Sequence, residues 1–350
     1  MVWDNKREIT DPKEKISVVT IGGGTGMSSV LGALRQLKDQ YKISAIITSM
    51  DSGGPAIVER TVYGVSPMSD LRKALLALAS SETYQDYLLS KIVAYRLDGR
   101  AGDRLSSMSL GNLMLLALEE ILGSRESALD GMTRLLNTAG DVIPVSLHTT
   151  NIRVDYDDGF YVTEEAQLDQ VDKNFLTRPQ VQITNISLEK QIPANPRAIE
   201  VIEAADVIVF PPGDPIGSII VNLLVSRVYD AITQSKAKIL WFPNIMSKLG
   251  QTPQPNSLSG HLALLEKYLP RPIDCIVYNQ AAVPKDVLKK YHDEECAELV
   301  VNDLPKDPRV VKTDLFWDQL YPFGSTEPTI RHDPDKIAKV FSNIVSKILG

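Results

Sequence analysis

Short apolar runs rich in β-branched residues alternate with segments of helical periodicity along most of the chain. Residues 18–21 and 43–48 are runs of the first kind, and residues 27–38 between them carry apolar side chains at helical spacing. Such alternation is typical of βαβ units around a buried parallel sheet. The same rhythm returns after Pro196, where we expect strands at 207–210, 238–242 and 274–278 with helices at 198–205, 216–233 and 260–269.

Two stretches interrupt this alternation. Helical patterns follow one another without an intervening strand, which predicts a helical insertion over about 83–137 or a helical layer on one sheet face. Short strand patterns then flank the turn residues 157–159, which predicts a small antiparallel excursion over about 142–190. We therefore expect an α/β, Rossmann-like three-layer fold with a mainly parallel sheet, built as one domain over 16–350 after a polar N-terminal extension at 1–15.

Composition narrows the class of protein. With 350 residues, of which 43% are hydrophobic, the chain can bury a full core. A net charge of −7 and a pI of about 5.3 argue against nucleic-acid binding, which depends on clustered Lys and Arg. The two cysteines, Cys275 and Cys296, fit inert thiols of a reducing compartment. Because no apolar run approaches the roughly 20 residues of a membrane span and no signal peptide is present, we expect a cytoplasmic protein without a membrane span.

The run Gly22-Gly23-Gly24-Thr25-Gly26 directly follows the first expected strand. Glycines at a strand end let backbone amides approach a phosphate, and the amino terminus of the next helix favours an anion. The spacing excludes the usual dinucleotide fingerprint, since the required last glycine is Met27 or Ser29, and no Walker motif follows. We therefore expect a phosphorylated, nucleotide-type ligand rather than a nicotinamide cofactor.

Two neighbouring segments could complete this site. Asp51, Gly53 and Gly54 follow the second strand, where Asp51 could hold Mg²⁺ or a ribose hydroxyl, or could simply begin a turn. Asp70 and Arg72 open the next helix. There, Asp70 favours the helix amino terminus, whereas Arg72 could contact a phosphate or form an ordinary salt bridge.

Two later segments are weaker candidates. Gly111 and Asn112 begin an apolar helix capped by a serine, where the glycine could admit a ligand or another helix. Pro212, Gly213 and Asp214 end another buried strand and precede a long helical pattern, which makes a second candidate ligand loop.

Other kinds of catalytic site find no support in the sequence. No pair among the histidines has the helical spacing of metal ligands, and no Gly-x-Ser-x-Gly motif occurs. We therefore expect neither a zinc centre nor a hydrolase triad, and we expect His148 and His292 to be surface or structural residues.

In their order and spacing, these segments resemble the YvcK/CofD family over nearly the whole chain. The resemblance is carried by the following motifs: Gly22–Gly26, Asp51–Gly54, Asp70-Leu71-Arg72, Ser109-Leu110-Gly111-Asn112-Leu113, Pro212-Gly213 with Ser218-Ile219-Ile220, Asn222-Leu223-Leu224-Val225, Asn244-Ile245-Met246, Gly250-Gln251-Thr252 and Arg331-His332-Asp333-Pro334. The last motif, residues 218–225 and the methionine-containing loop make the chain more similar to the bacterial YvcK branch.

The resemblance to that branch implies a regulatory protein of carbon metabolism and of cell-envelope or cell-shape control that binds a nucleotide sugar such as UDP-N-acetylglucosamine. On this interpretation the glycine run and Gly213 hold the diphosphate. Asp51 and Asn244 would orient sugar hydroxyls, and Arg331 would contact the nucleotide. The family further implies that a homodimer forms.

Two more residues and an alternative activity follow from the resemblance. Ser218 belongs to the second glycine motif, and Tyr291 is a companion of Arg331. The archaeal-type branch contains 2-phospho-L-lactate transferases, so the alternative is a transferase that moves a 2-phospholactyl-type group from a nucleotide-activated donor. It would place Mg²⁺ at Asp51 or Asp70, with Arg72 neutralising charge on the phosphate.

The chain departs from the family pattern at several positions. The family usually has Asp-Asp-Gly-Gly-Ser at residues 51–55. In this chain Ser52 replaces the second aspartate and Pro55 replaces the serine, and Lys73 replaces an asparagine further on. Met108 stands where a histidine is usual, and Asp214 where a serine is usual. Because a carboxylate is lost and no His or Glu is positioned as a base, we favour binding over catalysis, with no cofactor required except possible Mg²⁺.

Overall fold

The computed structural model describes residues 15–50, 67–97, 108–164, 167–168, 181–247, 256–295, 297–318 and 329–350. Its main sheet has seven strands in the order β10-β9-β8-β7-β1-β2-β3, and the neighbouring strands pair in parallel. Their bounds are Ile16–Gly22 (β1), Tyr41–Ile47 (β2), Gly140–Pro144 (β3), Val207–Phe210 (β7), Lys238–Trp241 (β8), Cys275–Asn279 (β9) and Val310–Thr313 (β10). The expected Rossmann-like class is confirmed.

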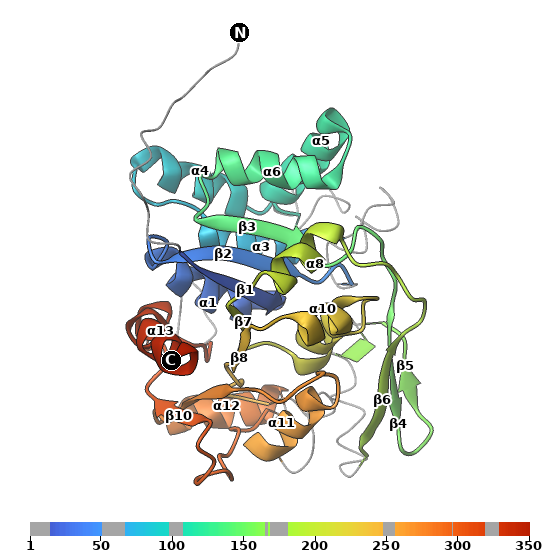
Figure 1. Cartoon of the computed structure of the whole chain (residues 1–350), viewed down its shortest axis with the longest axis vertical. Helices are drawn as coiled ribbons and strands as arrows, with labels where there is room; N and C mark the ends of the chain where they lie inside the picture. Colours follow the sequence, from blue (N-terminus) through green and yellow to red (C-terminus); the bar gives the residue numbers. More distant parts are fainter. Residues whose placement is uncertain are drawn as a thin grey trace.

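Helices cover both faces of this sheet, with α8 and α10 in front of it and α1 and α3 behind it in Figure 1. The helices that share the core behind the sheet are α1 (Gly24–Gln36), α3 (Ser69–Leu78), α5 (Leu110–Leu122), α6 (Arg125–Leu135) and α13 (Pro334–Leu349). Those on the other face are α8 (Pro196–Glu203), a π-helix at Pro215–Ile220, α9 (Val221–Leu223), α10 (Val228–Gln234) and α11 (Leu258–Glu266). α4 (Tyr84–Ala94) also reaches the core behind the sheet through Val93. A further helix of the described residues is α12 (Lys285–Glu295).

The central strands are apolar on both sides because each side meets a helical layer. Along β1, Val19 and Ile21 face the core shared with α8 and α10, whereas Val18 faces the core shared with α1 and α13. This double burial explains why the strands read as continuous apolar runs rather than as alternating patterns. It also fixes the register, so that the strands end together along one carboxyl edge of the sheet.

The helical middle of the chain forms as expected, with its starts set by caps. Thr83 and Asp86 form a capping box at α4, and the Ser109 side chain accepts a hydrogen bond from Asn112 N at the start of α5. At α3 the residue in the cap position is Met68, whose side chain makes no capping hydrogen bond, and Ser69 is the first helical residue. Met68 and Ser69 are both buried, so packing rather than a side-chain cap sets this boundary.

The antiparallel part is smaller than expected. Residues 140–144 form β3, which pairs in parallel with β2 and belongs to the main sheet. The separate sheet has the order β5-β4-β6, with bounds Ile152–Tyr156 (β4), Tyr161–Val162 (β5) and Ile183–Leu188 (β6). The open edge of β6 is covered by Tyr268, whose hydroxyl accepts a hydrogen bond from Ile186 N at 2.8 Å.

The prediction of a single helix over 216–233 is also wrong. The chain forms the π-helix first, then the short α9, and it turns before α10 at Arg227, whose φ of 72° is left-handed. Ser226 N donates to Ile192 O at 3.2 Å, so a contact from a distant segment interrupts the helix. The sequence pattern does not predict α12 or β10. The half-exposed side chains of β10 give it no apolar run.

Candidate functional site

The glycine run turns the chain from β1 into α1 and packs directly against the loop that follows β7. Gly24 has a φ of +68°, a left-handed conformation that favours glycine. A side-chain Cβ on Gly26 would overlap the Pro212 carbonyl, and one on Gly22 would lie 2.8 Å from Pro211 Cγ. Glycine is therefore required at these positions because the two loops approach so closely.

This contact lies at a topological switch point of the sheet. β1 and β7 are neighbours, yet the chain runs from β1 through β2 and β3 on one side and from β7 through β8 to β10 on the other. In open α/β sheets, ligands bind outside the carboxyl ends of the strands at such a point. The fold thus brings the two loops that the sequence singled out to its most suitable binding position.

Asp70 connects α3 to the glycine run. Its Oδ2 accepts a hydrogen bond from Gly24 N at 2.7 Å, and its Oδ1 accepts one from Lys73 Nζ at 2.8 Å. The carboxylate therefore lies at the amino terminus of α1, although we expected it to act on α3, its own helix. Gly24 N is already occupied by a side-chain oxygen, whereas Thr25 and Gly26 lie in the first helical turn, whose N–H groups lack intrahelical acceptors.

The second loop is held by two polar side chains. Asn244 accepts a hydrogen bond from Gly213 N at 2.6 Å and donates one to Gly213 O at 2.8 Å, so its amide fixes both backbone groups of this glycine. Asp214 accepts hydrogen bonds from Ile216 N at 3.1 Å and from Gly217 N at 2.6 Å, so it caps the π-helix. The carboxylate of Asp214, a departure from the family pattern, thus has a structural role here.

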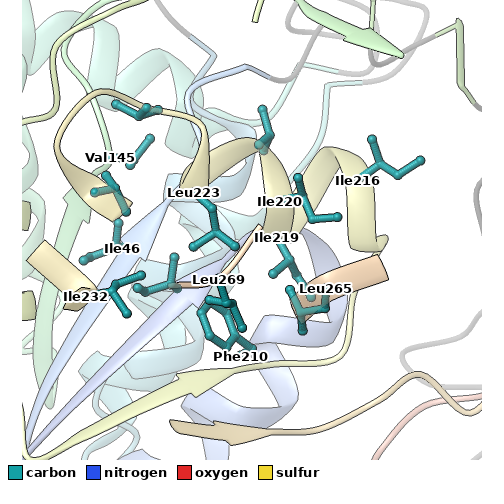
Figure 2. Close-up of a cluster of buried hydrophobic side chains, with 14 of the residues drawn as sticks. Ile46, Val145, Phe210, Ile216, Ile219, Ile220, Leu223, Ile232, Leu265 and Leu269 are labelled. Atoms are coloured by element: carbon teal, nitrogen blue, oxygen red, sulfur yellow. The ribbon is translucent and has the colours of Figure 1, made fainter. Parts of the chain in front are cut away.

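The π-helix presents Ser218 to the glycine run. Its isoleucines Ile219 and Ile220 are buried, and Figure 2 shows them in the apolar cluster with Phe210 and Leu265. Ser218 lies on the other side, where its Oγ would be 3.3 Å from a Cβ on Gly24. Asn222, which was not among the predicted site residues, donates to Ser218 O at 2.8 Å and to Gly22 O at 3.4 Å. Asn222 therefore links the end of β1 to the π-helix that follows the second loop.

Arg72, Gly111 and Asn112 come together in a buried polar network. Arg72 is only 5% exposed, and its Nε donates to Asn112 Oδ1 at 2.9 Å. Asn112 Oδ1 also accepts from Ser109 Oγ at 2.8 Å. A Cβ on Gly111 would lie 2.7 Å from Arg72 Cδ, so this glycine makes room for the arginine. A phosphate contact of Arg72 stays a prediction.

Tyr291 and Arg331 form a separate group near the end of the chain. The Tyr291 hydroxyl accepts a hydrogen bond from Ile330 N at 2.9 Å, and Arg331 O accepts one from Trp317 N at 3.0 Å. Burial lowers the pKa of the Arg331 guanidinium, while the nearby Tyr291 acts in the opposite direction. The two expected companions are thus neighbours. These two hydrogen bonds join them to residues 317 and 330, and a role at the glycine run stays a prediction.

Three predicted ligand-binding residues, Asp51, Gly53 and Gly54, lie outside the described residues. Ser52, Pro55 and the 250–252 motif lie outside them as well. Within the described ranges no group of three or more His, Cys, Asp or Glu side chains is arranged to hold a metal ion. Each oxygen of Asp70 accepts one hydrogen bond, from Gly24 N and from Lys73 Nζ, and Mg²⁺ at Asp70 stays a prediction. The helices of these ranges are too short or too polar to cross a membrane.

A cavity of about 300 Å³ begins at Asn244 and lies at the carboxyl ends of β8 and β9. Its polar lining includes Asn244, Tyr278, Asn279, Gln280, Asn302 and Lys312. Asn302 Nδ2 is buried and has no hydrogen-bond partner, so it offers a donor to a ligand. No sequence motif predicts this cavity, although the polar pair Asn279-Gln280 at the end of a strand is a signal that points to it.

Two buried histidines and a buried cysteine take no part in these loops. Burial lowers the pKa of His261 and of His332 to about 4, so both are neutral near pH 7. Burial likewise raises the pKa of the Cys275 thiol to about 11, which keeps it protonated and unreactive. His148 and His292 are exposed, in agreement with the surface position expected for them.

Comparison with known proteins gives consistent matches. The family model for "2-phospho-L-lactate transferase CofD" matches residues 18–316. Proteins named "Putative gluconeogenesis factor" from Thermotoga maritima and Aquifex aeolicus are 33% and 32% identical, over 94% and 96% of this chain and 99% and 98% of their own length. A solved UPF0052-family structure from Bacillus halodurans superposes with a TM-score of 0.81 at 28% identity, covering 94% of this chain and 99% of that one.

Proposed function

Because the chain belongs to the CofD family, we propose that it binds a nucleotide sugar of the UDP-N-acetylglucosamine type and acts as a regulatory protein of carbon metabolism and of cell-envelope or cell-shape control. The relatives named as gluconeogenesis factors support the metabolic part of this proposal. The ligand would lie at the carboxyl edge of the sheet, across the loops that follow β1 and β7.

The observation that carries the proposal is the direct contact between these two loops at the switch point. Gly26 has no room for a side chain because of the Pro212 carbonyl, and Gly213 has little because of Ser218. A surface made of backbone and one hydroxyl can approach a diphosphate closely, as larger side chains could not. Both loops are also held from behind, by Asp70 and Asn244, so the surface is formed before a ligand arrives.

The diphosphate would bind the first-turn amides of α1, at Thr25 and Gly26, and the Ser218 hydroxyl. These amides lack intrahelical acceptors, and the helix dipole favours a negative charge there. Lys73, which replaces an asparagine of the family pattern, adds a positive charge within 2.8 Å of Asp70. The sugar or the base would enter the adjoining cavity at Asn244, whose volume of about 300 Å³ lies at the lower end of the range for ligand pockets.

Binding requires no general base. The two carboxylates that the structure describes at these loops are both engaged, Asp70 by Gly24 and Lys73 and Asp214 by the amides of the π-helix. The alternative, a transferase of a 2-phospholactyl-type group, is favoured by the description of the matching family model. It would need a cation at Asp51 or at Asp70, whose two oxygens each accept one hydrogen bond, from Gly24 N and Lys73 Nζ.

Isothermal titration at fixed pH and salt tests the proposal, with UDP-N-acetylglucosamine, UDP and GDP each added with and without Mg²⁺. We expect saturable binding of the UDP-sugar that does not depend on Mg²⁺. Mg²⁺-dependent binding of GDP, without binding of the UDP-sugar, would reject this function in favour of the transferase. Uridine, which carries no phosphate, serves as the control for the diphosphate contribution.

A further inference from the structure

A second and larger cavity lies at the carboxyl edge beyond β3, away from the loops of β1 and β7. Its volume is about 670 Å³, and it is enclosed by the turn between α5 and α6, residues 147–149 after β3, and residues 190–193 after β6. Three segments distant in the sequence therefore meet there. Nothing in the nucleotide-sugar proposal makes use of this space.

Arg125 provides the first indication of a ligand. This side chain lines the cavity and is only 8% exposed, although it carries a charge. Its Nε and Nη2 donate to the Glu119 carboxylate at 3.3 and 3.1 Å, whereas Nη1 is buried and has no hydrogen-bond partner. A buried charged donor without an acceptor is costly, so a shift of this side chain toward an anion in the cavity would be favourable.

Two exposed side chains on the rim add to this donor. Lys190 and His148 both line the cavity, and no hydrogen bond or ion pair of their side-chain nitrogens is present among the residues that the structure describes. The amino terminus of α6, an 11-residue helix that begins at Arg125, also faces the cavity and favours a negative charge. These groups converge from three different segments.

The acidic groups limit the kind of ligand. Glu119 is held by Arg125, and Glu126 is a second carboxylate on the lining. The formal charges of Arg125 and Lys190 therefore balance those of the two glutamates, and the cavity has no net charge to attract every anion. A ligand with one anionic group and several hydroxyls matches this lining, because the hydroxyls can donate to Glu126 while the anion accepts from Lys190 and Arg125.

We propose that this cavity is a binding site for a phosphorylated sugar, separate from the site at the glycine run. One wall of the cavity is tied to the end of β2, because Ser49, two residues after this strand, donates from its Oγ to His148 O at 3.2 Å. The site does not rest on nucleotide-sugar binding, and either site can exist without the other.

Nuclear magnetic resonance of the histidine rings tests the proposal with the intact chain. Glucose 6-phosphate is the probe, and glucose and inorganic phosphate are the partial ligands. We expect glucose 6-phosphate to shift the ring signals of His148 saturably and to leave those of His292 on α12 unchanged. Each partial ligand should bind more weakly. Equal shifts at His148 and His292, or none, would overturn the proposal.

A matched pair of variants tests the role of the charge. Lys190→Met should weaken glucose 6-phosphate binding about tenfold, which is about 1.4 kcal/mol, whereas Lys236→Met, at an exposed lysine outside the cavity, should not. Equal affinities of the two variants would overturn the site. Glucose 6-phosphate should also bind in the presence of saturating UDP-N-acetylglucosamine, and displacement by the UDP-sugar would contradict a separate site. A chain that binds only the sugar phosphate would retain this proposal and reject the proposed function.

Discussion

Asp70 Oδ2 accepts a hydrogen bond from Gly24 N across 2.7 Å, so a carboxylate on α3 is held at the amino terminus of α1. Lys73 balances the charge from the other side. The glycine run therefore owes its conformation to a residue 46 positions later in the chain, and its remaining first-turn amides stay directed to the edge of the sheet.

Replacing Asp70 tests this link. Asp70→Ala removes the acceptor for Gly24 N and should lower the free energy of unfolding by about 1–3 kcal/mol, because a partly buried donor loses a charged partner. Asp70→Asn retains an oxygen that can accept the same hydrogen bond and should lose less. Urea unfolding of both variants measures the difference, and equal losses would mean that the Gly24 contact contributes little.

Two glycines of α1 give substitutions of opposite sign. Gly26→Ala would overlap the Pro212 carbonyl and should destabilise the chain by about 1–3 kcal/mol, as overpacking does. Gly32→Ala lies in the same helix and meets Pro334 Cβ only at 3.5 Å, an ordinary contact. It should stabilise by up to about 1 kcal/mol through helix propensity. Thermal unfolding gives the melting temperature of each variant. A shift of both melting temperatures in the same direction would contradict the close approach of the loops.

Asn244→Asp removes a donor from the second loop. The aspartate can still accept from Gly213 N but would repel the Gly213 carbonyl, to which Asn244 Nδ2 now donates at 2.8 Å. We expect an approximately tenfold loss of UDP-N-acetylglucosamine affinity, about the effect of one hydrogen bond with a charged or buried partner. Asn343→Asp, on an exposed position of α13, is the control and should retain wild-type affinity in the same titration.

Stability should fall on acidification between pH 6.5 and 4. The pKa values of His261 and His332 are lowered from 6.5 to about 4 by burial, so in this window the unfolded chain binds more protons than the folded one. Stability is thus fully present above pH 6.5 and is lost as pH decreases, by up to about 1.4 kcal/mol per pH unit for each histidine.

The matched variant for this window is His261→Gln, which should reduce the slope of unfolding free energy against pH. The slope is measured as the urea midpoint at several pH values between 6.5 and 4.5. An unchanged slope in the variant would show that His261 is not buried in its neutral form. The carboxylates with lowered pKa values, such as Asp307, titrate below this window and therefore do not contribute to the slope.

The sequence predicted the sheet and its glycine turn well because both depend on local chemistry. The strand of Val19 and Ile21 is buried on both sides, and the following glycines admit a tight turn. The break at Arg227 could not be predicted, because it depends on a hydrogen bond between Ser226 and the distant Ile192. The same limit applies to β3, which has no local feature to assign it to the main sheet.

The candidate site was predicted as a set of residue types but not as a set of contacts. Glycine motifs after two strands indicated where a ligand loop would form, and the fold places them together. The use of Asp70 and Asn244 as acceptors for Gly24 and Gly213 depends on packing between elements far apart in the chain. Arg72 had an equally plausible surface role in the sequence, and its burial beside Asn112 became visible only in three dimensions.

Hydrogen–deuterium exchange of the whole chain, with and without UDP-N-acetylglucosamine, tests the central claim most directly. The account predicts slower exchange in the peptides that contain Thr25–Gly26 and Gly213–Ser218, where the diphosphate would cover backbone amides. Protection confined to the peptides around Arg125 and Lys190, or no protection at saturating UDP-sugar, would contradict binding at the switch point.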